Sequence, residues 1–226
     1  MANFVLLHGA WHGPWCWHKV EPMLTSQGHK VICPTLPCQK HVGLSAYTQQ
    51  VETIISNISQ PIVLVAHSMS GLIACNLSNK ALNKISRIIF IAAYATNENT
   101  SLIKIIDELS EPSIPEDCLE TSGNIITTKP NIKNIFYNTC SKLDADSSFN
   151  MLVPQSFKAL SSVIKVKSEL LRVDTSYIVC SNDKAISKAS QETMANQIGA
   201  QTVKIGSCHS PFLSQPDKIA ALISNF

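Results

Sequence analysis

Charged residues are scarce in this chain, and no run of like charge occurs in it. Lys, Arg, Asp and Glu make up 15% of the 226 residues, and their near balance leaves a formal net charge of +2. Such a pattern cannot follow a phosphate backbone or an anionic membrane, so nucleic acid and lipid surfaces are poor candidates for partners. Low charge together with 45% hydrophobic residues also argues against global disorder and suits a large buried core.

Long apolar segments and targeting signals are also missing. No stretch approaches the roughly 20 apolar residues of a membrane-spanning helix. The first residues lack a basic region and turn polar at His8, unlike a secretory signal peptide. We therefore expect a soluble, cytoplasmic protein without a membrane partner.

The cysteine spacing of a zinc site is absent, although cysteine itself is common. The chain has eight cysteines, but no two of them form a CxxC pair. The chain is also far longer than the small secreted domains that depend on disulfides. Cys208 and His209 are adjacent, which is poor geometry for chelation and leaves His209 available for another role. We expect free thiols and neither a metal nor an organic cofactor.

Six short, nearly continuous apolar runs predict the strands of a buried parallel sheet. Helical stretches separate most of them, which is typical of an α/β fold with helices on both faces of the sheet. We predict a mainly parallel sheet in the order second, first, third, fourth, fifth, sixth strand. The runs cover residues 4–7, 30–33, 62–66, 87–92, 176–180 and 201–205.

The alternation of strands and helices breaks between about residues 97 and 173. Prolines at positions 112, 115, 130 and 154 interrupt this segment, which otherwise holds short amphipathic pieces. Its length exceeds an ordinary connection, so it forms either a cap over a site or a small subdomain. We expect one domain over residues 1–226, with this segment as a small, mostly helical cap.

A serine follows the third predicted strand in the setting of a nucleophile elbow. His67-Ser68-Met69-Ser70-Gly71 connects an apolar strand directly to a helix. The consensus has glycine two residues before and two residues after the serine, because the turn is tight and strained. Here Ala66 and Ser70 occupy those places. Both are small, so Ser68 is a candidate nucleophile, and a plain strand-to-helix turn with a capping serine is the alternative.

An acid and a base follow later strands in the order that a hydrolase needs. Asp183 comes after the fifth predicted strand and His209 after the sixth, so both should lie at the same sheet edge as Ser68. A serine attacks a carbonyl only if an oriented base takes its proton. Asp174 precedes the fifth predicted strand and Asp217 falls in the predicted C-terminal helix, so we expect both to lie on the far side of the sheet. We predict a triad of Ser68, Asp183 and His209, against the alternatives of a loop aspartate and a solvated loop histidine.

Two backbone amides are candidates for an oxyanion hole. The amide of Met69 directly follows the candidate nucleophile, and the turn after the first strand brings the amide of Ala10 beside it. The two turns meet because the first and third strands are neighbours in the expected sheet order. We also expect His67 to point away from the site and Trp11 to pack its loop against the first helix.

The opening segment, residues 4–17, includes His8-Gly9-Ala10 and continues through Trp17. It resembles the plant methyl esterase and hydroxynitrile lyase branch of the α/β-hydrolase superfamily, together with bacterial esterase relatives. The likeness covers nearly the whole chain and is weakest over residues 95–129. It implies the α/β-hydrolase fold, the triad named above and oxyanion amides from Ala10 and Met69. Further matching segments are residues 66–71, 136–140, 152–156, 177–183 and the surroundings of His209.

The same resemblance helps to choose between reactions. Lyases of this branch carry a threonine after the first-strand histidine and a lysine after the catalytic histidine, whereas this chain has Gly9 and Ser210. We therefore expect a serine carboxylic ester hydrolase that forms an acyl-enzyme on Ser68 with a small ester. A lyase, a C–C hydrolase, an acyltransferase and a non-catalytic ligand-binding receptor remain alternatives. The sequence does not identify the ester, and it does not decide between a monomer and a homodimer.

Overall fold

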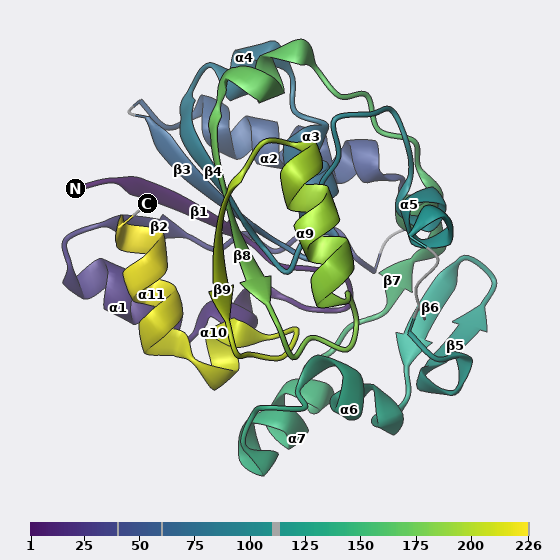
Figure 1. Ribbon diagram of the computed structural model, residues 1–226. Coiled ribbons are helices and arrows are strands. Elements are labelled where there is room, and N and C mark those ends of the chain that lie inside the picture. Colours follow the sequence, from purple (N-terminus) through teal and green to yellow (C-terminus); the bar gives the residue numbers. More distant parts are fainter. Residues whose placement is uncertain (40, 60, 110–113, 226) are drawn as a thin grey trace.

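A six-stranded parallel sheet forms the centre of the protein (Figure 1). The computed structural model describes residues 1–39, 41–59, 61–109 and 114–225. The strands follow the order β2-β1-β3-β4-β8-β9, and every neighbouring pair is parallel, which confirms the predicted order. The strands are β1 (Asn3–Leu7), β2 (Lys30–Ile32), β3 (Ile62–His67), β4 (Ile85–Ile91), β8 (Asp174–Cys180) and β9 (Gln201–Ile205).

Helices cover both faces of this sheet, so its central strands are buried. On one face α1 and α11 pack together, and α2, α3 and α9 lie on the other (Figure 1). In α2, the side chains of Tyr47, Val51 and Ile55 recur every four residues on the buried side. The helices are α1 (Val20–Ser26), α2 (Leu44–Ser56), α3 (Ser70–Cys75), α4 (Asn79–Leu82), α9 (Lys188–Gln197), α10 (Pro211–Ser214) and α11 (Pro216–Asn225), with a 3-10 turn η1 (Pro14–Trp17).

The segment between β4 and β8 contains several short helices, and most of it lies beyond the carboxyl ends of the strands, whereas its last 3-10 turn, at residues 168–172, lies beside α4 at the opposite end of the sheet (Figure 1). It also contains a three-stranded antiparallel sheet, in the order β5-β6-β7, that we did not predict. Part of the expected cap, residues 110–113, falls outside the described residues. Its helices are α5 (Leu102–Glu108), α6 (Lys133–Phe136), α7 (Lys142–Asn150) and α8 (Phe157–Ser161), with 3-10 turns η2 (Glu116–Cys118), η3 (Pro130–Ile132) and η4 (Ser168–Arg172). Its strands are β5 (Leu119–Ser122), β6 (Ile125–Thr128) and β7 (Gln155–Ser156).

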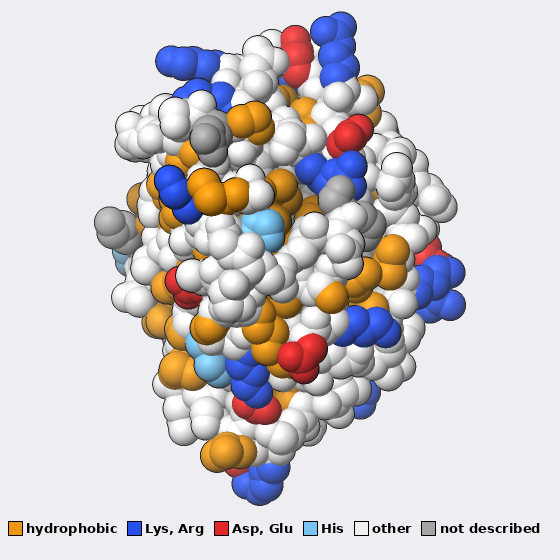
Figure 2. All heavy atoms as spheres, turned by 90° about the vertical axis from the view of Figure 1, so that its left-hand side faces the viewer, with side chains coloured by type: hydrophobic (Ala, Val, Ile, Leu, Met, Phe, Trp, Pro, Cys, Tyr) orange, Lys and Arg blue, Asp and Glu red, His pale blue; other side chains and the backbone are white. Residues whose placement is uncertain are grey.

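Charges are dispersed over the face that α1 and α11 help to form. Figure 2 shows Lys and Arg side chains interspersed with Asp, Glu and uncharged groups on this face. Over the described part of the chain, every helix is too short or too polar to cross a bilayer.

Candidate active site

Ser68, His209 and Asp183 form a continuous chain of hydrogen bonds at the carboxyl edge of the sheet. Ser68 Oγ lies 3.0 Å from His209 Nε2, and His209 Nδ1 lies 2.8 Å from Asp183 Oδ2. Each residue follows a different strand, respectively β3, β9 and β8. All three are buried, His209 with only 2% of its surface exposed. The structure thus brings together all three residues that the sequence suggested for a triad.

The turn that carries Ser68 is strained and tightly packed. Ser68 has φ +55°, a left-handed conformation that is unfavourable for a residue with a side chain. A Cβ on Gly71 would lie 2.2 Å from the carbonyl oxygen of Tyr94, so only glycine fits at that position. Ser70, where the consensus has glycine, has its Oγ 2.8 Å from the carbonyl oxygen of His67 and 3.1 Å from that of Leu7. Its hydroxyl therefore braces the turn, which explains why serine is tolerated there.

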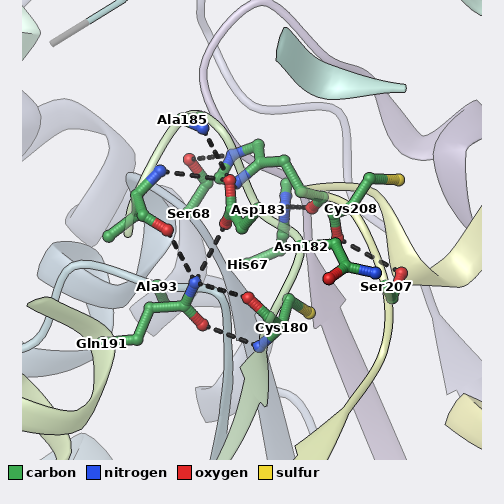
Figure 3. A network of polar contacts seen from close by, with 12 residues as sticks. His67, Ser68, Ala93, Cys180, Asn182, Asp183, Ala185, Gln191, Ser207 and Cys208 are labelled. Carbon is green, nitrogen blue, oxygen red and sulfur yellow. Dashed lines mark hydrogen bonds and ion pairs between the residues drawn. The ribbon is translucent and has the colours of Figure 1, made fainter. Parts of the chain in front are cut away.

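The carboxylate of Asp183 is surrounded by hydrogen-bond donors (Figure 3). Oδ1 accepts from the amides of Ala185 at 2.7 Å and Ile186 at 3.1 Å, while Oδ2 accepts from Gln191 Nε2 at 3.1 Å as well as from His209. Donors on both oxygens stabilise a negative charge and fix the plane of the carboxylate. Asp183 is therefore built to orient the imidazole of His209 and to stabilise a positive charge on it.

Gln191 is a part of the site that we did not predict from the sequence. Its side chain is fully buried on α9. Besides Asp183, its amide nitrogen donates to the carbonyl oxygens of Ile186 at 2.8 Å and Cys180 at 3.2 Å, and its oxygen accepts from the amide of Cys180 at 2.9 Å. The sequence gives only a weak indication of this role, because Gln191 is a single glutamine on the buried side of a polar helix.

His67 lies against the triad, contrary to our expectation that it points away. Its Nε2 is 2.8 Å from the carbonyl oxygen of His209, and the two rings have centroids 4.7 Å apart. Burial holds the pKa of His67 well below its usual range. A neutral ring with hydrogen on Nε2 donates to this carbonyl oxygen, so His67 supports the loop that carries His209.

His12 connects the loop after β1 to the cap. Its Nδ1 lies 2.9 Å from the carbonyl oxygen of Ala10, and its Nε2 lies 3.0 Å from the hydroxyl of Tyr137. Burial lowers the pKa of His12 to about 3, so the ring is neutral. With its proton on Nδ1 it donates to Ala10 and accepts from Tyr137. The loop that should supply one oxyanion amide is thereby held in place.

The loop after β1 also packs directly against the serine turn. A Cβ on Gly9 would lie 2.7 Å from Ser68 Cβ and 3.2 Å from Ser68 Oγ. Ala10 and Met69, whose amides we predicted to form an oxyanion hole, line the same cavity as Ser68. The position after the first-strand histidine therefore has no room for a side chain.

An apolar cavity of about 170 Å³ opens onto Ser68 and His209. Trp11 lines it and donates from Nε1 to the carbonyl oxygen of Ile126 in the cap, instead of packing against the first helix as expected. Among the described lining residues there is no Lys, Arg, Asp or Glu. Nor do the described His, Cys, Asp and Glu side chains form a group of three that could hold a metal ion. The cavity suits a neutral, largely apolar molecule. Its cap side includes Leu102, Ile106, Ile114, Leu119, Ile126 and Leu160.

The model of the Alpha/beta hydrolase family matches residues 4–222 of this chain. The chain belongs to this family. This alpha/beta hydrolase is 25% identical in sequence to salicylic acid-binding protein 2 of Nicotiana tabacum, over 97% of this chain and 94% of that protein. It is 26% identical to methyl jasmonate esterase 1 of Vitis vinifera, over 98% of this chain and 95% of the relative.

A solved structure shares the fold of this alpha/beta hydrolase over its whole length. The crystal structure of polyneuridine aldehyde esterase superposes with a TM-score of 0.88 at 24% sequence identity, covering 100% of this chain and 98% of that one. At this identity the likeness establishes the fold. The expected superfamily is therefore confirmed by the family match and by the fold.

Proposed function

We propose that this hydrolase is a serine carboxylic ester hydrolase that forms an acyl-enzyme on Ser68. The observation that carries the proposal is the hydrogen-bonded chain from Ser68 through His209 to Asp183, which ends at an apolar cavity. The similarity to methyl jasmonate esterase 1 supports ester hydrolysis as the reaction. The size and apolar lining of the cavity favour a small, neutral ester as substrate.

In the first half of the reaction, Ser68 Oγ attacks the carbonyl carbon of the ester. His209 Nε2, 3.0 Å away, takes the hydroxyl proton, and Asp183 stabilises the imidazolium that results. The amides of Ala10 and Met69 are the proposed donors to the oxyanion, because both residues line the cavity beside Ser68. The tetrahedral adduct collapses when His209 returns the proton to the leaving alkoxide, which departs as the alcohol.

In the second half, water replaces the alcohol. His209 takes a proton from the water as its oxygen attacks the acyl carbon, and the same donors stabilise the second oxyanion. Collapse breaks the bond to Ser68 Oγ, which recovers its proton from His209. The products are the free carboxylic acid and the original hydroxyl of Ser68.

The surroundings of Ser68 do not favour the lyase alternative. The threonine of the lyases would replace Gly9, where even a Cβ would lie 2.7 Å from Ser68 Cβ. The position of the lyase lysine holds Ser210, which is buried and uncharged. A cation that could hold a leaving cyanide is therefore missing from that position, whereas ester hydrolysis does not need one.

Turnover of a 4-nitrophenyl ester with a short acyl chain tests the proposal. Ser68→Ala should lower kcat by about 10⁴-fold or more and abolish labelling by a fluorophosphonate, because the nucleophile is gone. Ser45→Ala, an exposed serine on α2, is the matched control and should keep full activity. Full activity of Ser68→Ala would remove this residue from the mechanism. Tight ester binding by the wild type without turnover or labelling would instead indicate a receptor.

A further inference from the structure

Two free thiols meet where the cap touches the loop of His209. Cys140 Sγ lies 3.6 Å from Cys208 Sγ. Cys140 is half-buried and lies between α6 and α7, whereas Cys208 is buried and immediately precedes His209. Both belong to the described cysteines that carry no disulfide. Among the described residues, this is the one pair of cysteines whose sulfurs lie within hydrogen-bond range of each other.

The surroundings of the pair favour a reactive thiol. The hydrogen bond between the two sulfurs lowers the pKa of Cys208, and the hydroxyl of Thr139 acts in the same direction. A lowered pKa increases the fraction of thiolate, which is the form that reacts with oxidants and disulfides. The half-buried position of Cys140 gives small oxidants a route to the pair.

We propose that Cys140 and Cys208 form a modification site, a dithiol that a peroxide converts into a disulfide joining the cap to the loop of His209. The modification itself is independent of the proposed function. Only its effect on turnover depends on that function.

The chemistry of the proposed step is balanced by hydrogen peroxide as the oxidant. One thiolate attacks a peroxide oxygen and becomes a sulfenic acid, while the other oxygen leaves as water after protonation. The second thiol then attacks the sulfenic sulfur, the S–S bond forms, and a second water leaves. The two sulfurs together lose two electrons, which reduce one peroxide to two waters.

The cap residues next to Cys140 contact three loops of the candidate site, those that follow β1, β8 and β9. Tyr137 bonds to His12 in the loop after β1 at 3.0 Å, and Asn138 donates to the carbonyl oxygen of Asn182, next to Asp183, at 3.0 Å. Thr139 accepts from the amide of Cys208 at 3.0 Å. A new covalent bond at Cys140 therefore acts on a segment that already holds the site together.

A disulfide would change the position of the residue before His209. Its sulfurs lie about 2.0 Å apart, so the pair, now at 3.6 Å, must approach by roughly 1.5 Å. His209 Nε2 is 3.0 Å from Ser68 Oγ, and a shift of about 1 Å in such a group can lower the rate about 100-fold. We expect the oxidised protein to turn over esters about 100-fold more slowly than the reduced protein.

The experiment uses the full chain and hydrogen peroxide, with free thiols, intact mass and ester turnover measured on the same samples. We expect the loss of two thiols, a mass decrease of about 2 Da, and one cross-linked peptide pair that contains Cys140 and Cys208. Dithiothreitol should restore both the mass and kcat. Oxygen adducts without a cross-link, or a cross-link between other cysteines, would refute the site. A cross-link with unchanged kcat would refute its effect on His209.

Variants separate this pair from general oxidation. Cys140→Ser should keep the kcat of the reduced wild type and become resistant to peroxide. Cys118→Ser removes another buried cap cysteine, and this matched control should stay sensitive. If Cys140→Ser fails to fold, peptide mapping of the wild type still decides whether the disulfide forms. If no ester is hydrolysed at all, the proposed function fails, while thiol counting and mass still test the modification.

Discussion

Gln191 donates a hydrogen bond of 3.1 Å to Asp183 Oδ2, the same carboxylate oxygen that faces His209 Nδ1. The glutamine cannot itself take part in proton transfer. Its amide is fixed by the main chain of Cys180 on both sides. The orientation of Asp183, and through it that of the His209 imidazole, thus depends on a side chain of the following helix, α9.

Replacing Gln191 by methionine should lower kcat about 10- to 100-fold and leave KM nearly unchanged. Methionine has a similar length but cannot donate to Asp183, and a hydrogen bond to a charged group contributes roughly 1.5–3 kcal/mol. Steady-state kinetics with a nitrophenyl ester gives both constants. Gln197→Met, an exposed position on the same helix, is the control and should behave like the wild type. A rise in KM with constant kcat would show that Gln191 serves binding and not the orientation of Asp183.

Gly9→Ala should abolish most activity, although it adds only a methyl group. The new Cβ would lie 2.7 Å from Ser68 Cβ and 3.0 Å from His67 Nδ1, so the loop or the serine turn must shift. A displacement of about 1 Å at a reacting group can reduce the rate about 100-fold. Gly206→Ala is the matched control, since a Cβ there meets no atom within 4 Å. Wild-type kcat/KM in Gly9→Ala would mean that this loop is free to move away from Ser68.

Replacing Ser68 by glycine should stabilise the protein relative to Ser68→Ala. The backbone at this position has φ +55°, and a left-handed conformation costs a residue with a Cβ about 1 kcal/mol or more compared with glycine. Thermal unfolding should show a Tm roughly 2–4 °C higher for Ser68→Gly. At Ser45, inside α2, the same pair of substitutions should give the opposite order, because glycine is unfavourable in a helix. Equal Tm values for the two Ser68 variants would argue against strain in the turn.

Acidification should destabilise the protein between pH 6.5 and about 4. Burial lowers the pKa of His8 to about 4 and that of His12 to about 3, both from 6.5. In this range the unfolded chain binds protons that the folded chain does not, so stability falls as the pH falls, by about 1.4 kcal/mol per pH unit for each such histidine. Urea unfolding at pH 7, 6 and 5 measures the free energy of unfolding. His12→Gln should reduce its dependence on pH by the contribution of one histidine, about 1.4 kcal/mol per pH unit. Constant stability from pH 7 to 5 would mean that these rings become protonated in the fold.

The central sheet could be predicted because its inner strands β1, β3, β4 and β8 are nearly continuous apolar runs and are largely buried. The predicted run at residues 201–205 coincides with β9, and the others differ from the observed strands only at their ends. The cap sheet escaped prediction because β5 and β6 have four residues each and β7 two, with a non-local pairing between β6 and β7. Strands this short are defined by their partners more than by their own composition.

The candidate triad could be anticipated for a similar physical reason. Parallel strands end at one edge of the sheet, so polar residues that follow separate strands converge there. Gln191 has no comparable marker, because a single buried glutamine on α9 becomes visible only when its four hydrogen bonds are known. The contact of Trp11 with the cap depends on its own backbone conformation, with φ +60°. A tryptophan in the sequence gives no indication of such a conformation.

The absence of Lys and Arg from the described lining of the cavity has a consequence for the end of the reaction cycle. Ester cleavage turns a neutral molecule into an acid that ionises at neutral pH. An anion is poorly accommodated among aliphatic side chains without a counter-ion. The acid should therefore depart readily and compete only weakly with fresh ester, so product inhibition should stay weak as the acid accumulates.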